Sequence, residues 1–148
     1  MAIIETKCFS GKKPLVLPDA ADVETVAIDV EFPATAPSVG DLIRLCDLPP
    51  YTKVLDWALI FPDVDSNGTP TLAMSLGVEN AGGTDLGSEV WGTGLTAGQS
   101  TTLVRNTTSL AAQGDSSVQR RIDLKVTTAA ATYAGSGKVG QVLLQLQG

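Results

Sequence analysis

The chain has 148 residues, of which 43% are hydrophobic and 18% charged, with a formal net charge of −6 at pH 7. This length favours one domain that buries about 70% of its unfolded surface, and this composition argues against disorder. The acidic pI near 4.4 and the scattered basic residues argue against a nucleic-acid partner, because phosphate contacts need clustered Lys and Arg.

The first 22 residues differ in pattern from the rest and predict an extended arm ahead of a domain spanning residues 23–148. Pro14 and Pro18 bracket a short apolar run, and proline cannot donate a hydrogen bond to a strand ladder. We expect this arm to fold back on its own domain or to clip onto a neighbour, with a bare tail least favoured. The apolar side chains that need cover, and that we expect at an interface, are Ile3, Ile4, Leu15, Val16 and Leu17.

Period-two alternation of apolar residues predicts about eight strands after the arm. They are expected near residues 26–32, 42–46, 53–61, 71–79, 89–91, 101–105, 121–127 and 141–147. The strand over 53–61 has apolar residues on both faces, so we expect it to be central and covered twice. The last two strands are expected to pair as a hairpin, with Arg121, Asp123 and Lys125 facing water.

These strands predict an all-β fold, namely an antiparallel β-sandwich of jelly-roll-like type, because no long amphipathic helix is evident. One helical turn is expected at most, over 109–113. Residues 80–88 are expected to form a loop, from their Gly and Asn content. The side chains expected in the core are Val26, Ile28, Val30, Trp57, Leu59, Leu76, Leu124, Val126, Val142 and Leu144.

Catalytic chemistry has little support in this sequence. It contains no histidine, which removes the commonest general base and metal ligand and every Ser–His–Asp or Cys–His triad. Paired carboxylates remain conceivable, for example Asp56 near Asp63 or Glu79. Cys8 and Cys46 lack metal-ligand or redox spacing and are expected to be free thiols. We expect no enzyme, no catalytic residue and no cofactor.

The sharpest motif is the run from Asp63 to Gly68, which matches the first six positions of a calcium loop of the D-x-[DN]-x-[DN]-G type. The twelfth position is Met74 instead of a bidentate Glu, and strands flank the motif where helices are usual. We therefore expect a turn in which Asp63, Asp65 and Asn67 make local bonds to the backbone, and no bound metal.

Aromatic residues are few, and Trp57 is expected in the core because its strand is central. Trp91 and Tyr133 fall in looser segments, so we expect them to be exposed and to serve as interface anchors. Together with Tyr51 they would also suit a sugar-stacking platform.

Several phrases resemble small structural proteins of tailed bacteriophages. They are Leu124 to Gly135 followed by Gly140 to Leu144, and Trp57 to Phe61, Asp63 to Gly68 and Leu72 to Val78. These segments are similar to capsid decoration, or cement, proteins. The resemblance implies a virion protein on the capsid surface, with the major capsid protein lattice as partner and self-association as a dimer or trimer.

Two other functions remain open at this point: a carbohydrate-binding or adhesin module, and, ranked last, a small hydrolase that uses carboxylates. The first residues turn polar at Glu5 and lack the apolar core of a signal peptide. No apolar run approaches the roughly 20 residues of a membrane span. We therefore expect synthesis in the host cytoplasm and no membrane partner.

Overall fold

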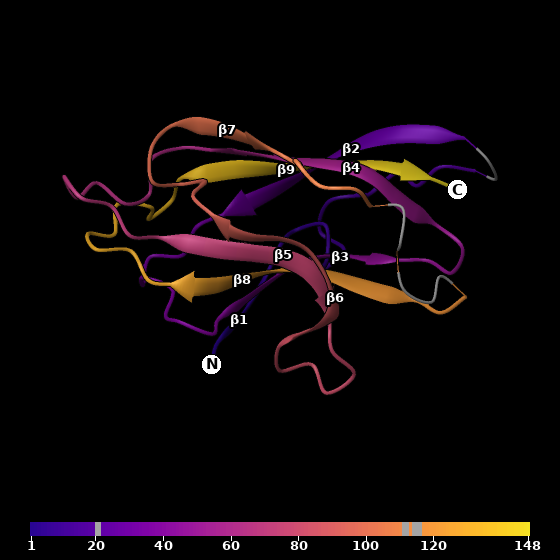
Figure 1. The fold of residues 1–148 in the computed structure, drawn as a ribbon, viewed down its shortest axis with the longest axis horizontal. Coiled ribbons are helices and arrows are strands. Elements are labelled where there is room, and N and C mark those ends of the chain that lie inside the picture. Colours follow the sequence, from indigo (N-terminus) through magenta and orange to yellow (C-terminus); the bar gives the residue numbers. More distant parts are fainter. Residues whose placement is uncertain (20–21, 111–112, 114–116) are drawn as a thin grey trace.

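The computed structural model describes residues 1–19, 22–110, 113 and 117–148, and within these ranges the chain forms nine strands in two sheets. The five-stranded sheet has the order β1 (Ile3–Glu5), β3 (Leu42–Leu48), β8 (Arg120–Thr128), β5 (Ala73–Glu79), β6 (Leu86–Leu95). The four-stranded sheet has the order β2 (Val23–Glu31), β9 (Val139–Gln147), β4 (Lys53–Phe61), β7 (Thr102–Arg105). Figure 1 shows the two sheets as stacked layers, which confirms the all-β sandwich.

Strands β2 to β9 are distributed in a jelly-roll-like order, with eight strands in two sheets. The first of them, β2, pairs along its length with the last, β9. All pairs among the described strands are antiparallel except β1 with β3, which is parallel. Residues far apart in sequence are therefore brought together in every layer.

The expected C-terminal hairpin is wrong. β8 pairs with β3 and β5 in the five-stranded sheet, whereas β9 pairs with β2 and β4 in the other, and Figure 1 shows them in different layers. Residues 129–138 cross between the sheets. Period-two alternation fixes which side chains share a face, but it does not identify the neighbouring strand.

The double cover expected for β4 is also wrong, although the strand is central, between β9 and β7. A bulge between Val54 and Asp56 shifts the register, so Val54 joins Trp57 on the inner face. Leu55 and Ile60 are then left 40% and 41% exposed on the outer face. This strand has one buried face and one largely open face.

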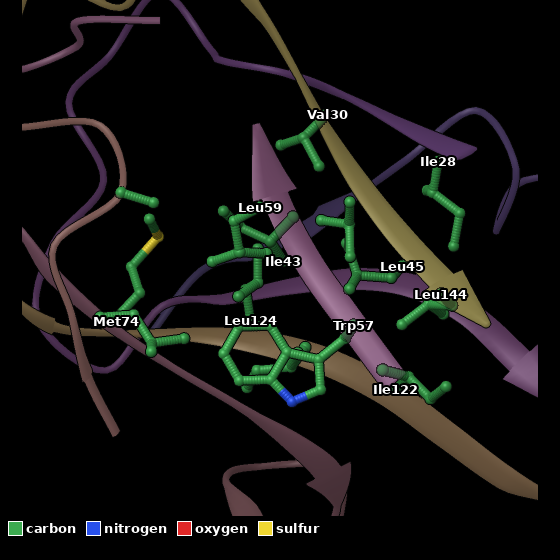
Figure 2. Packing of buried hydrophobic residues seen from close by; sticks show 14 of the residues in the cluster. Ile28, Val30, Ile43, Leu45, Trp57, Leu59, Met74, Ile122, Leu124 and Leu144 are labelled. Atoms are coloured by element: carbon green, nitrogen blue, oxygen red, sulfur yellow. The ribbon is translucent and has the colours of Figure 1, made fainter. Parts of the chain in front are cut away.

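All ten side chains expected in the core are buried between the sheets. Figure 2 shows Trp57 and Leu59 of β4 among side chains of the opposite sheet, including Ile122 and Leu124 of β8. Because this core occupies the inner faces, function has to come from the two outer faces, the sheet edges and the loops.

Smaller differences concern the segments between strands. The loop expected at 80–88 is shorter, because β6 already begins at Leu86. The helical turn expected at 109–113 falls partly on residues 111–112, outside the described ranges. Among the described residues there is no helix with the length and apolar character needed to cross a bilayer.

Candidate functional site

The N-terminal segment lies against its own sandwich. β1 pairs with β3, and the Thr6 hydroxyl donates a 2.7 Å hydrogen bond to the Leu45 carbonyl. Of the expected interface residues, Ile4, Leu15 and Leu17 are partly buried against the core. Ile3 and Val16 are 40% and 67% exposed. The alternation along this segment therefore turns some apolar side chains inward and leaves others available for a partner.

The outer face of the five-stranded sheet holds a cluster of charged side chains. Arg44 donates a 2.9 Å bond to Glu79, and Arg121 donates bonds of 2.9 Å to Asp47 and 3.3 Å to Glu79. The N-terminal segment covers this cluster with Phe9, whose ring centroid lies 4.8 Å from the Arg121 guanidinium carbon and 5.7 Å from that of Arg44. Such cation–π contacts hold the segment on the sheet.

At the centre of this cluster Asp123 is completely buried, which corrects the expectation that it faces water. Burial, followed by the hydrogen bond and the charge of Glu79, raises the pKa of Asp123 to about 8. For Glu79, burial opposes ionisation, but the bond to Asp123 and the bond and charge of Arg44 outweigh it and lower the pKa. The two carboxyl groups therefore share one proton at neutral pH.

This pair lacks the access that catalysis needs. Loop 80–85 covers it, since a Cβ at Gly83 would lie 3.5 Å from Arg44 Nη2 and 3.7 Å from Glu79 Oε2. Asp56 is exposed on the opposite sheet, so the pairing of Asp56 with Glu79, which the sequence left conceivable, does not form. No group of three or more His, Cys, Asp or Glu in the described ranges is placed to hold a metal ion.

The run from Asp63 to Gly68 forms a turn with local Asx-type bonds, as expected. The Asp63 and Asn67 side chains accept backbone bonds from the residues two positions further on. Asp65 is buried and does more than the sequence predicted. Its carboxylate accepts backbone N–H bonds of 2.8 to 3.1 Å from Thr71, Leu72, Ala131 and Thr132.

Asp65 thereby ties the loop after β4 to the link between β8 and β9. Burial opposes its ionisation, but the four N–H donors outweigh burial and hold the pKa of Asp65 well below its usual range. A carboxylate whose oxygens are used in this way has little capacity left to coordinate a cation. The Asp65 side chain thus holds together two loops that are far apart in the sequence.

The aromatic residues do not form a sugar platform. Trp57 and Trp91 are 3% and 5% exposed and belong to the core, so the expectation of an exposed Trp91 is wrong. Tyr133 is partly buried, and its hydroxyl donates a 2.5 Å bond to the Pro33 carbonyl. Tyr51, at 69% exposure, is the one strongly exposed side chain among the two Trp and two Tyr.

The outer face of the four-stranded sheet differs from the charged face, and its residues were missed in the sequence. Ile60 of β4 lies opposite Leu103 of β7, and both are more than 40% exposed. Leu143 of β9 lies between Ala27 and Ala58 in the next row. Ile60 does carry a signal in the sequence, since it alternates out of phase with the core residues Trp57 and Leu59. Leu55 carries none, because it alternates in phase with them and only the bulge exposes it.

The chain has no matching family model, and no curated protein matches it. It is similar to a chain in the solved structure "Capsid of Ralstonia phage GP4", with a TM-score of 0.83 and 29% sequence identity over 99% of this chain and 97% of that one. It also shares its fold with a chain of the "Cyanophage Pam1 capsid asymmetric unit", with a TM-score of 0.67 and 23% identity, over 93% of this chain and 94% of that one.

The likeness to a phage capsid chain supports a phage capsid-related protein with a structural role in the virion. The match runs from end to end of both chains, so it concerns the whole sandwich and not one shared motif.

Proposed function

We propose that the protein is a decoration, or cement, subunit that binds the outside of a phage capsid lattice and stabilises it. The observation that supports this most is the end-to-end likeness to a capsid chain of nearly the same extent, 99% of one and 97% of the other. A small sandwich that matches a capsid chain over nearly the whole of both fits an added subunit. The resemblance of the Leu124 to Leu144 region to decoration proteins points the same way.

The physical basis of this function is multivalent contact. A subunit that touches several capsid proteins at once, and its own sister copies as a dimer or trimer, gains avidity from individually modest contacts. Chemistry is not required, and the buried state of Asp123 agrees with a protein that is not an enzyme. The partners in this proposal are the major capsid protein lattice and further copies of the chain, without nucleic acid or membrane.

The test is reconstitution on capsids that lack the protein. Purified chain is mixed with such capsids, which are then sedimented, and the heat or low-salt stability of the decorated particles is measured against undecorated ones. We expect the chain to sediment with capsids at a fixed stoichiometry and to raise the temperature at which they rupture. Failure to sediment over a range of salt concentrations contradicts the proposal.

The carbohydrate-binding alternative has lost its support, because it needs several exposed aromatic rings in one cleft. Trp57 and Trp91 are buried and Tyr133 is bonded to Pro33. A single exposed Tyr51 does not make such a cleft.

A further inference from the structure

The two outer faces of the sandwich differ in how far the protein covers them. On the five-stranded sheet, the N-terminal segment with Phe9 and loop 80–85 lie over the charged cluster. On the four-stranded sheet, apolar side chains from each strand are left open. The large ones that are at least 40% exposed are Val23, Leu55, Ile60, Leu103 and Val139.

These open side chains form rows across the sheet. Ile60 pairs with Leu103 on one side and with Gln141 on the other. In the next row Leu143 pairs with both Ala27 and Ala58. Between the apolar positions stand the amides of β9, which offer hydrogen bonds without charge. An uncharged centre of this kind agrees with the depletion of charged residues at the core of protein interfaces.

Charge on this face is nearly balanced, although the chain as a whole carries −6. Asp29, at the β2 margin, is paired with Lys13, and Glu31 lies 3.5 Å from Lys7. The other charged side chains directed outward are Lys53, Asp56 and Arg105. A nearly neutral face does not require a basic partner, and it lacks the positive charge that nucleic acid needs.

The area of the face helps to decide which partner it binds, a second copy of the chain or the capsid lattice. Three strands of nine residues and one of four, spaced about 4.8 Å apart, cover roughly 500 Å². Two copies meeting face to face would bury about 1,000 Å² in total, which falls short of the range of stable specific interfaces. Such a face suits a contact that is weak alone and is repeated many times on a lattice.

We propose that the outer face of the four-stranded sheet is the surface that docks on the capsid shell, a statement that rests on the proposed decoration function. Ile60, Leu103 and Leu143 form its apolar centre, and Gln141 and Gln145 provide uncharged hydrogen bonds around it. Contacts between sister copies use other surfaces. The charged face, closed by the protein's own N-terminal segment, points away from the shell.

Capsid binding by surface variants tests this assignment. Leu103→Glu and, separately, Ile60→Lys place a charge at the apolar centre, at positions already 46% and 41% exposed, from which a charged side chain reaches water. The matched control is Val39→Glu, at a residue 61% exposed before β3 and outside both sheets. Circular dichroism and melting temperature verify folding, and sedimentation with capsids lacking the protein measures binding.

We expect each face variant to bind at least tenfold more weakly than the unaltered chain, while Val39→Glu binds normally. If the unaltered chain binds and both face variants bind equally well, the docking face is wrong and the decoration function stands. If the unaltered chain does not bind capsids, the decoration function and the docking face are both contradicted. Light scattering adds a further outcome, because a face variant that breaks an oligomer of the free protein identifies the face as a contact between copies and overturns the assignment.

Discussion

The carboxyl group of Asp123 on β8 lies against that of Glu79 on β5, at the buried centre of the outer face of the five-stranded sheet. Neither oxygen of Asp123 receives an N–H or O–H donor from the described residues. A proton on Asp123 resolves this, because the protonated acid donates to Glu79, which is also bonded to Arg44 and Arg121. The packing of this face is therefore expected to weaken when alkaline pH removes the proton from Asp123.

The first prediction is that stability falls as pH rises from 5 to 9. The folded pKa of Asp123, about 8, lies above its ordinary value of 3.8, so the folded state holds this proton more tightly than the unfolded chain. Its contribution is complete below about pH 4 and is lost as pH approaches 8. The chain has no histidine, so few other groups titrate in this window. Melting temperature against pH measures the effect.

The matched variant is Asp123→Asn, which is nearly isosteric, stays neutral and still donates to Glu79. We expect its melting temperature to change much less between pH 5 and pH 9 than that of the unaltered chain. Equal slopes for the two proteins contradict a shared proton.

The second prediction concerns Asp65. Asp65→Asn replaces one acceptor oxygen by an NH₂ group that faces backbone donors, so bonds from Thr71, Leu72 and Ala131 or from Thr132 are lost. We expect a loss of about 2–4 kcal/mol in the free energy of unfolding, measured with urea. Added calcium is expected to leave melting unchanged, because the oxygens are occupied.

Asp63→Asn is the control for this prediction, since its single accepted bond, from the Asp65 N–H, is preserved by an amide oxygen. Its free energy of unfolding is expected to lie within about 0.5 kcal/mol of that of the unaltered chain. Micromolar calcium binding that disappears in Asp65→Asn would show that the turn is an ion site after all.

A third prediction uses the close approach of β5 to β6. A Cβ at Gly77 would lie 2.6 Å from the Glu89 carbonyl oxygen and 3.0 Å from the Val90 Cα, both backbone atoms. Gly77→Ala therefore forces the strands apart, and we expect a cost of about 1–3 kcal/mol. Gly68→Ala, where a Cβ meets nothing within 4 Å, is expected to be nearly neutral. A neutral Gly77→Ala in thermal melts argues against this strand packing.

The fourth prediction separates the two sides of the N-terminal segment. Leu17 packs against the core, whereas its neighbour Val16 is 67% exposed. Leu17→Ser is expected to reduce the free energy of unfolding by about 1–2 kcal/mol. Val16→Ser is expected to change it by no more than about 0.5 kcal/mol. Chemical denaturation measures both. Similar small effects for the two would mean that this segment is an arm without a structural role in its own domain.

The sequence by itself determined the strands and their buried faces. Alternation placed Ile28, Leu124 and Leu144 in the core because the side-chain period of a strand is a local property of the backbone. The absence of histidine, also local information, removed most catalytic schemes. The Asx-type bonds of Asp63 and Asn67 followed from short-range chemistry as well.

Tertiary structure alone decided which strands pair and which polar groups are buried. β8 and β9 look like a hairpin in sequence but lie in opposite sheets, because pairing depends on distant strands that compete for the same edges. Asp123 alternates as a solvent-facing residue, yet Phe9 and loop 80–85 close over its face. The bulge at Leu55 turned Val54 to the inner face and left Leu55 exposed, and Ile60 lies on an outer face that the sheet leaves open. Alternation gives a side chain's face, but only long-range packing decides whether that face meets water, the rest of the chain or a partner.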